Sequence, residues 1–209
     1  RDVHVADSGF RGRLAFHGQI VPTKGLHVLL EAMAMLPEKH RAGPERVTLD
    51  VRGARLDEQS NEYQRRIRSL ASRTGDAVQF KGRYRQADLP ALMRGVDWLV
   101  VPSTWWENSP VVIQEAFASG VPVICGDIGG MAEKVPDHEF GLQFRVGDAR
   151  DLADRIVQAV ATPGMRDSFS RRLPRVQSVG ETVNRHLELY DTLRRDVLSS
   201  QEAETTATA

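Results

Sequence analysis

The segment ENSPVVIQE follows an apolar run and leads into a helical pattern, which makes it the sharpest candidate for chemistry in the chain. Pro110 suits the first turn of a helix, with Asn108 or Ser109 as its N-cap. The backbone amides of Ser109, Val111 and Val112 would have no partners inside that helix, and the helix dipole adds positive potential beside them. These groups predict an anion site whose natural ligand is a phosphate.

The same segment carries a carboxylate at each end. Glu115 lies in the otherwise apolar stretch VVIQEAFASGVPVIC, where a buried carboxylate is costly unless hydroxyls, amides or a cation bind it. The ordinary alternative is a helical Glu that points to solvent, but the apolar surroundings and the spacing from Glu107 favour a ligand-binding role. Glu107 alone would carry little weight, because acidic residues near a helix start are favoured by the dipole.

Two glycine-containing turns supply further candidates. The turn HGQIVPTKG holds Gly18, which permits close backbone approach, and Lys24, whose ammonium can reach a phosphate oxygen or can simply help to start a helix. This turn fits neither the P-loop pattern nor G-x-G-x-x-G. Further along, Gly129 and Gly130 precede a helix with Glu133 in its first turn, and they either shape a ligand loop or form an ordinary turn and cap.

Short apolar runs typical of strands alternate with longer helical patterns, which indicates a parallel sheet covered by helices. The predicted strands are residues 13–18, 47–53, 77–82, 97–103, 122–126 and 141–145. The predicted helices are residues 24–36, 60–74, 88–93, 111–120 with Gly120 as C-cap, 150–161 and 180–198. Right-handed crossovers of this length imply an α/β, Rossmann-like doubly wound parallel six-stranded sheet with helices on both faces. Ligands of such sheets bind outside the carboxyl ends of the strands, where all three candidate segments lie.

Two further features concern single elements. His17 is the only histidine at this edge of the sheet, and we expect it to be a polar residue at a strand end. The last helix carries an apolar stripe that must be buried against this sheet or against another domain. The stripe consists of Val183, Leu187, Tyr190, Leu193 and Val197.

Composition and absent motifs exclude several classes of protein. The 209 residues include 28 basic and 28 acidic side chains, and a net charge of zero argues against a nucleic-acid binder. The single cysteine, Cys125, cannot form an internal disulfide, which favours a reducing compartment. No apolar run is long enough for a membrane span, and the first residues are too polar for a signal peptide. The sequence contains no D-x-D, C-x-x-C, H-E-x-x-H or G-x-S-x-G, so metal-held phosphates, zinc sites and a hydrolase nucleophile have no support.

Taken in order, the segments resemble the carboxy-terminal, donor-binding domain of a GT-B glycosyltransferase of the large retaining family 4. The resemblance covers residues 14–160 and is carried by FHGQIVPTKGLHVLLEAM, VTLDVRG, VQFKGRY, DWLVVPSTWWENSPVVIQEAFASGVPVICGDIGGMAE and FGLQFRVGDARDLADRIVQAV. The specific part is E-x(7)-E with an upstream K-G and a downstream G-G-x-x-E. The resemblance implies the C-terminal half of a GT-B architecture and a nucleoside diphosphate-sugar as donor. It also implies transfer with retention, without a cofactor or an obligatory metal.

The resemblance also implies roles for individual residues. Glu115 would hold the ribose hydroxyls, Glu107 would face the transferred sugar, and Lys24 would contact the diphosphate. Gln19 stands where the family usually has an arginine, and Arg83 lies near the expected contacts to the base. The other donor-binding residues implied are Gly18, Asn108, Ser109, Pro110, Val111, Val112, Gly129 and Gly130.

The chain departs from the family pattern in three ways. Gln19 removes one positive charge at the diphosphate, Pro110 supplies no amide where the family has a glycine-rich stretch, and the amino-terminal acceptor domain is absent. We therefore expect a linker remnant over 1–12, a donor-binding domain over 13–198 and a flexible tail over 199–209.

The remaining expectations concern the full-length protein. It would be a bacterial hexosyltransferase of the cytoplasm, with peripheral association at the inner face of the membrane and no nucleic-acid partner. Its acceptor would be a glycan, a glycolipid or a small molecule bound by the missing domain. This chain alone would bind a nucleotide without turnover. The alternatives are a GT-B epimerase, a nucleotide-sugar hydrolase, or a degenerate module that only binds.

Overall fold

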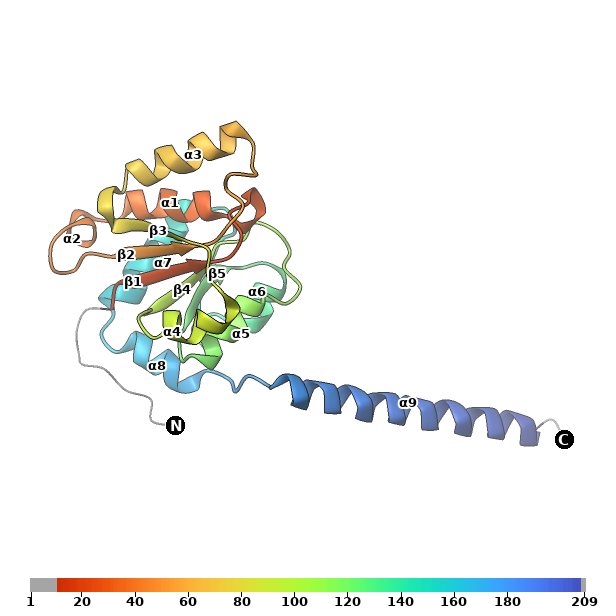
Figure 1. The fold of residues 1–209 in the computed structure, drawn as a ribbon. Coiled ribbons are helices and arrows are strands. Elements are labelled where there is room, and N and C mark those ends of the chain that lie inside the picture. The colour runs from red at the N-terminus through yellow and green to blue at the C-terminus, as the bar shows by residue number, and fades with distance from the viewer. Residues whose placement is uncertain (1–10, 208–209) are drawn as a thin grey trace. The chain divides into compact units, whose positions relative to one another are not determined.

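The computed structural model describes residues 11–207 and contains one parallel sheet (Figure 1). Its strands are β1 (Arg13–His17), β2 (Thr48–Arg52), β3 (Val78–Gly82), β4 (Trp98–Val101), β5 (Val123–Gly126) and β6 (Gly141–Phe144). They lie in the order β3-β2-β1-β4-β5-β6, and every neighbouring pair is parallel. The predicted Rossmann-like doubly wound sheet is therefore confirmed, with each strand within two residues of its predicted ends. The order reverses between β1 and β4, which is the point where such sheets bind ligands.

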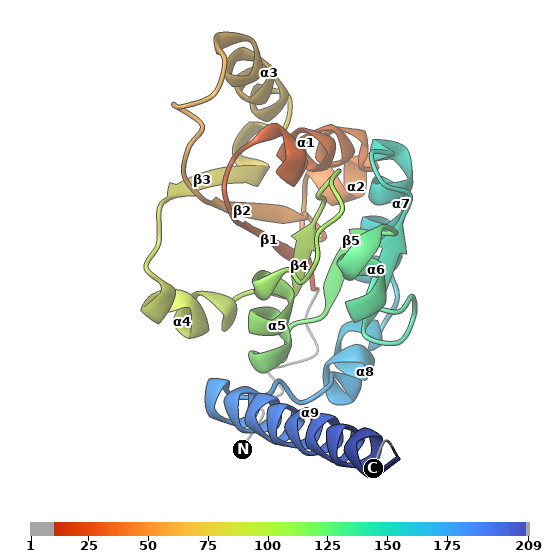
Figure 2. The same ribbon diagram turned by 90° about the vertical axis from the view of Figure 1, so that its right-hand side faces the viewer.

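Helices cover both faces of the sheet (Figures 1 and 2). On one face α1 (Leu26–Met35) packs against α3 (Asn61–Ser72) and α7 (Ala149–Ala161). On the other face α4 (Leu89–Met93) packs against α5 (Val111–Ala118), while α6 (Gly129–Lys134) packs on β5. The shorter elements are α2 (Glu38–Arg41), α8 (Met165–Arg172) and the 3-10 turns Pro22–Lys24, Gly75–Ala77 and Gln86–Asp88. The sequence patterns did not predict α2 or α8, because neither is long enough to show a clear apolar period.

Local sequence explains where the longer helices begin. Asp148 caps α7, and its carboxylate accepts hydrogen bonds from the amides of Arg150 and Asp151 at 3.0 Å each. Ser60 caps α3 in the same way, through the amide of Tyr63 at 3.3 Å. Both helices then bury an apolar stripe in the core, which supplies most of their stability.

The start of α5 corrects one prediction. Pro110, rather than Asn108 or Ser109, occupies the N-cap position, and no side chain of residues 11–207 caps the helix. The Ser109 hydroxyl instead accepts a hydrogen bond from the Gln114 amide at 3.2 Å. The predicted stop is confirmed within one residue, since Gly120 follows the C-cap with a φ of 72°.

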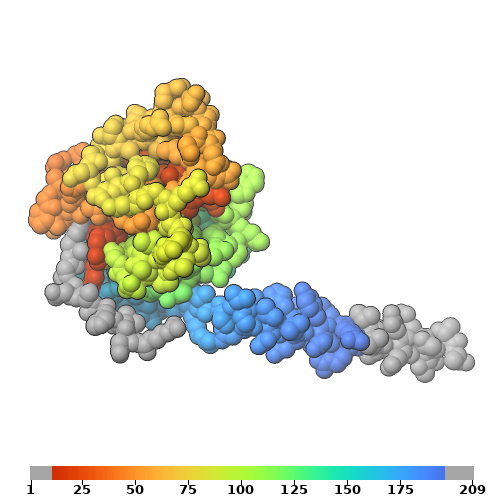
Figure 3. All heavy atoms as spheres, viewed as in Figure 1, coloured from red at the N-terminus to blue at the C-terminus, as the bar shows by residue number. Residues whose placement is uncertain are grey.

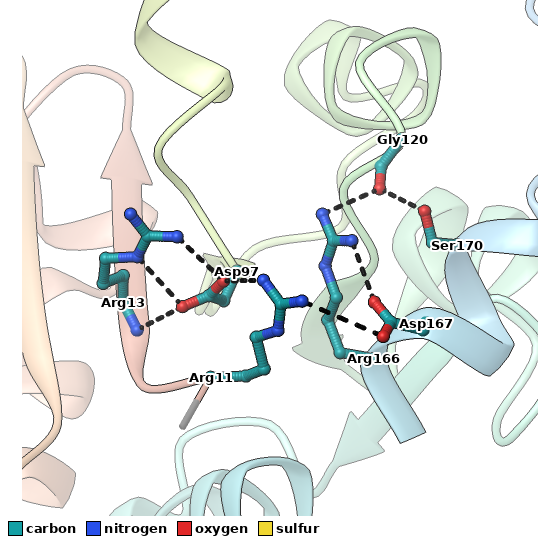
Figure 4. Close-up of polar contacts among 7 residues, drawn as sticks. All are labelled: Arg11, Arg13, Asp97, Gly120, Arg166, Asp167 and Ser170. Atoms are coloured by element: carbon teal, nitrogen blue, oxygen red, sulfur yellow. Dashed lines mark hydrogen bonds and ion pairs between the residues drawn. The ribbon is translucent and has the colours of Figure 1, made fainter. Parts of the chain in front are cut away.

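An ion-pair network ties the amino ends of β1 and β4 together, at the edge opposite the candidate segments (Figure 4). Asp97 is buried and accepts hydrogen bonds from the backbone amide of Arg13 at 3.0 Å and from its side chain at 3.2 and 3.3 Å. Arg11 pairs with both Asp97 and Asp167, at 3.7 and 3.9 Å. A cavity of about 480 Å³ beside this network holds none of the predicted site residues. We therefore assign this network a structural role, which is to hold the amino ends of β1 and β4 together.

The chain divides into two units, one that ends at Pro174 and one that begins at Arg175. The second unit contains α9 (Val179–Ala207), which begins with a capping box. In that box the Glu181 amide donates to the Ser178 hydroxyl at 3.2 Å, and the Ser178 amide donates to the Glu181 carboxylate at 2.7 Å.

The two ends of the chain differ in what the structure describes. Residues 199–207, expected to form a flexible tail, continue α9 as a helix. The physical reason is that the Gln, Glu and Ala side chains of this segment favour helix even without an apolar stripe. Residues 1–10 of the expected linker and residues 208–209 lie outside the described residues. Within the described part of the chain, no helix is both long enough and apolar enough to cross a membrane.

Candidate functional site

A cavity of about 680 Å³ opens at the carboxyl ends of β1 and β4, where the strand order reverses. In Figure 3 the red segment after β1 shows at the surface between the orange segment after β2 and the green segment after β4. The predicted site residues that line the cavity are Gly18, Gln19, Lys24, Glu107, Ser109, Pro110, Val111, Val112 and Glu115. Tertiary structure thus brings together two of the three candidate segments, which lie far apart in the sequence.

Lys24 and Glu107 form an ion pair within this cavity. The Lys24 Nζ lies 2.6 Å from the Glu107 Oε1, and the Ser103 hydroxyl donates to the same carboxylate oxygen at 2.9 Å. The Glu107 side chain is 17% exposed and the Lys24 side chain 35% exposed. A partly shielded pair of this kind keeps the ammonium at one position, facing the cavity.

The backbone around Lys24 explains how the pair is positioned. Gly25 follows with a φ of 69°, and a Cβ at this position would lie 1.8 Å from the carbonyl oxygen of Pro102. Only glycine fits such an approach. The amide of Thr104 also donates to the carbonyl of Thr23 at 2.9 Å. The turn after β1 is therefore fastened to the end of β4.

The two glycines at the start of α6 hold the Glu107 segment from the other side. The Gly130 amide donates to the Glu107 carbonyl at 2.6 Å, and a Cβ on Gly130 would lie 1.8 Å from the Asn108 carbonyl oxygen. Gly129 has a φ of 57° and packs against the Trp106 backbone. Asn108, Gly129 and Gly130 are not among the described residues that line the cavity. The glycines also form the first turn of α6 rather than preceding it, so Glu133 lies beyond that turn.

The start of α5 faces the same cavity. Its first hydrogen bond is donated by the Ile113 amide to the Pro110 carbonyl at 3.1 Å. The amides of Val111 and Val112 come before this bond and so have no intrahelical acceptor. Both residues line the cavity, which leaves their amides and the helix dipole for an anion.

Glu115 lies one turn further along α5. Its carboxylate accepts a hydrogen bond from the side-chain amide of Gln86. The side chain is half-buried rather than fully buried, because Ile113 and Phe117 occupy the face of α5 that packs on the sheet. Burial and the nearby Glu115 charge raise the pKa of Tyr84 above its ordinary value, since both disfavour a phenolate.

Sequence reasoning missed three polar residues of the cavity wall, namely Tyr84, Gln86 and Ser103. Each one lies at or just after the carboxyl end of a predicted strand, which is the signal that could have found them. Arg83 lines an adjoining cavity of about 300 Å³, which shares Tyr84 and Gln86 with the main one.

His17 is also part of the wall, and its side chain is 5% exposed. We expected His17 to be a polar residue at a strand end. Its position at the end of β1 agrees with that expectation, but its burial was not predicted. Within residues 11–207, no three His, Cys, Asp or Glu side chains gather so as to hold a metal ion.

Comparisons with known proteins agree with this geometry. The family model of glycosyl transferases group 1 matches residues 11–175. The D-inositol 3-phosphate glycosyltransferase of Salinispora arenicola is 31% identical over 186 residues, which are 85% of this chain and 40% of that protein. The sucrose-phosphate synthase of Thermosynechococcus elongatus superposes with a TM-score of 0.73 at 26% identity, over 91% of this chain and 47% of that one. Anabaena HepE in complex with UDP-glucose superposes with a TM-score of 0.64 at 26% identity, over 88% of this chain and 49% of that one. The chain thus spans less than half the length of each of these proteins.

Proposed function

Because this chain belongs to the glycosyl transferases group 1 family and has the fold of a carboxy-terminal GT-B domain, we propose that it binds the nucleotide-sugar donor of a hexosyltransferase. The full-length protein transfers the sugar to an acceptor with retention, without a cofactor or an obligatory metal. The observation that carries this proposal is the Lys24–Glu107 pair beside the free amides of α5, at the switch point of the sheet. The complex of Anabaena HepE with UDP-glucose supports a nucleoside diphosphate-sugar as the donor.

Lys24 and the start of α5 act on the leaving group. When the bond between the anomeric carbon and the diphosphate oxygen breaks, negative charge accumulates on the diphosphate. Lys24, Val111 and Val112 line one cavity, which supports a role for the ammonium and the two amides in stabilising that charge. Fixed donors of this kind stabilise a transition state because they need no reorganisation when the charge forms.

The two glutamates act on the neutral parts of the donor. Glu107 holds Lys24 in place and accepts hydrogen bonds from hydroxyls of the transferred sugar. Glu115 accepts hydrogen bonds from the ribose hydroxyls, as acidic residues do at other Rossmann-like sites. Its contact with Gln86 keeps the carboxylate oriented toward the cavity.

We also propose a class of acceptor and a cellular location for the full-length protein. The acceptor is a glycan, a glycolipid or a small molecule, bound by a domain outside this chain. The protein acts in the cytoplasm, with peripheral association at the inner face of the membrane.

Calorimetric titration of the chain with UDP, GDP and ADP, and with their sugars, tests donor binding. Glu115→Gln should weaken binding of the preferred nucleotide about tenfold, because a neutral amide is a poorer acceptor for two hydroxyls. Glu62→Gln, on exposed α3, is the matched control and should bind like the wild type. Unchanged affinity in Glu115→Gln would refute the assignment of Glu115.

Product analysis of the full-length protein tests the reaction. Transfer of the sugar with its anomeric configuration retained, and without loss of rate in EDTA, is the expected result. An isomerised sugar would indicate an epimerase, and a free sugar formed without acceptor would indicate a hydrolase. If the chain bound none of the nucleotides, the result would indicate a degenerate module rather than a donor-binding domain.

A further inference from the structure

His17 belongs to the wall of the cavity and has a buried imidazole without a hydrogen-bond partner in the described part of the chain. Its side chain is 5% exposed, and neither ring nitrogen has a hydrogen-bond partner within the described residues. Buried polar groups in proteins are nearly always hydrogen-bonded, so an unpaired imidazole that lines a cavity points to a ligand.

The alternation of side chains along β1 explains why His17 lies on the face of the sheet that borders the cavity. Leu14 and Phe16 belong to the apolar core that contains the buried residues of α1 and α7. Because side chains alternate along a strand, Ala15 and His17 lie on the opposite face of the sheet, the face of α4 and α5. His17 is the last residue of β1 and lines the cavity at the point where the strand ends.

The imidazole is neutral under ordinary conditions. Burial and the adjacent guanidinium of Arg52 lower the pKa of His17 to about 4. A neutral ring carries one N–H donor and one acceptor nitrogen. The ring centroid lies 5.3 Å from that of Tyr84, with the planes tilted by 41°, so packing against Tyr84 limits the movement of the imidazole.

The residues of the cavity wall form two sets that differ in charge. The first set is Lys24 with the α5 amides, and Lys24 is the only Lys or Arg among the described residues of the wall. His17, Tyr84, Gln86 and Glu115 offer uncharged donors and acceptors together with one carboxylate. A diphosphate therefore fits the first set of groups, and a nucleoside fits the second.

We propose that His17 hydrogen-bonds directly to the nucleoside of the donor and thereby contributes to nucleotide recognition. This inference rests on the proposed donor-binding function. It assigns a recognition role to a residue outside the pair of glutamates and Lys24. The contact is made by the set of wall residues that lacks Lys24 and is independent of the diphosphate.

Calorimetry on the chain with UDP, GDP, ADP and inorganic pyrophosphate tests the proposal. His17→Phe keeps an aromatic ring against Tyr84 but removes both hydrogen-bonding groups. The affinity for the preferred nucleoside diphosphate should fall about tenfold, as expected for one lost hydrogen bond in a shielded site, while the affinity for pyrophosphate stays the same. His17→Asn, which retains a donor and an acceptor, should recover part of the loss.

A second histidine provides the matched control. His27 also has a buried, unpartnered nitrogen and packs against a tyrosine, Tyr63, with ring centroids 6.0 Å apart. It is not among the described residues that line the cavity, so His27→Phe should leave every affinity unchanged. Thermal melting confirms that each variant is folded, and His17→Leu replaces His17→Phe if the larger ring is not tolerated.

The outcomes separate this inference from the proposed function. If the wild-type chain binds none of the three nucleoside diphosphates, the donor-binding function fails and the inference fails with it. If the wild type binds but His17→Phe and His17→Leu bind equally well, only the inference is overturned. An equal loss of nucleotide and pyrophosphate would also overturn it, because the effect would then lie outside the nucleoside.

Discussion

The Lys24–Glu107 pair leads to a prediction of opposite effects for its two members. The ammonium attracts a diphosphate, whereas the carboxylate competes for the same ammonium at 2.6 Å. Lys24→Ala should therefore weaken the binding of a nucleoside diphosphate, and Glu107→Gln should strengthen it. A pair that served only to hold the fold together would lose affinity in both variants.

The structure allows rough magnitudes. Unit charges about 4 Å apart attract by about 4 kcal/mol at an effective dielectric constant of about 20. Lys24 is 35% exposed and must loosen its contact with Glu107, so the net contribution is smaller. About 2 kcal/mol corresponds to roughly 30-fold weaker binding in Lys24→Ala. Removal of the competing carboxylate should yield about 1 kcal/mol, or roughly fivefold tighter binding in Glu107→Gln.

Calorimetric titration of the chain with its preferred nucleoside diphosphate, at low and at high salt, measures both effects. The loss in Lys24→Ala should shrink at high salt because the interaction is screened. Lys134→Ala and Glu62→Gln change the same residue types away from the cavity and should bind like the wild type. Weaker binding in both Lys24→Ala and Glu107→Gln, or no change in Lys24→Ala, would refute the reasoning.

Three further predictions concern backbone approach, the ion-pair network and pH. Gly130→Ala places a Cβ 1.8 Å from the Asn108 carbonyl oxygen, so it should displace the Glu107 segment and lower nucleotide affinity about tenfold by calorimetry. Gly95→Ala, where a Cβ meets nothing within 4 Å, should leave that affinity unchanged. Asp97→Ala leaves the Arg13 amide unpaired in a buried site and should lower the Tm by about 5–10 °C, whereas Asp57→Ala on an exposed loop should not. The folded pKa of His17 is about 4 and lies below its ordinary 6.5, so the stability it contributes is present above pH 6.5 and is lost as pH falls toward 4. Urea unfolding at pH 7 and near pH 4.5 should therefore show a larger loss for the wild type than for His17→Phe, by up to about 3 kcal/mol, and equal losses would contradict the shift.

Most of the fold follows from patterns that are local in sequence. Apolar strands such as WLVV and amphipathic helices such as α7 are recognisable because burial imposes a period on the residues themselves. The rule that ligands bind at the carboxyl ends of parallel strands then predicted that the three candidate segments lie at one edge of the sheet. The extension of α9 to Ala207 escaped this reasoning because helix propensity acts there without an apolar stripe.

Tertiary contacts decided the arrangement inside the site. Sequence alone could not show that Glu107 holds Lys24, because the two residues are 83 positions apart. It also left the roles of Gly129 and Gly130 open, and their contact with the Glu107 segment depends on how closely two backbones approach. That a position accepts only glycine cannot be recognised until the location of the neighbouring carbonyl oxygen is known.

The sequence by itself determined the doubly wound sheet, the edge at which ligands bind and the residue types available there. Only the tertiary structure decided which of those residues share one cavity and that Gln86 lies against Glu115. It also decided that His17 is buried there, with neither ring nitrogen hydrogen-bonded to any residue that the structure describes. The physical reason is that secondary structure arises from short-range periodicity, whereas a binding site depends on distances between segments that only packing sets.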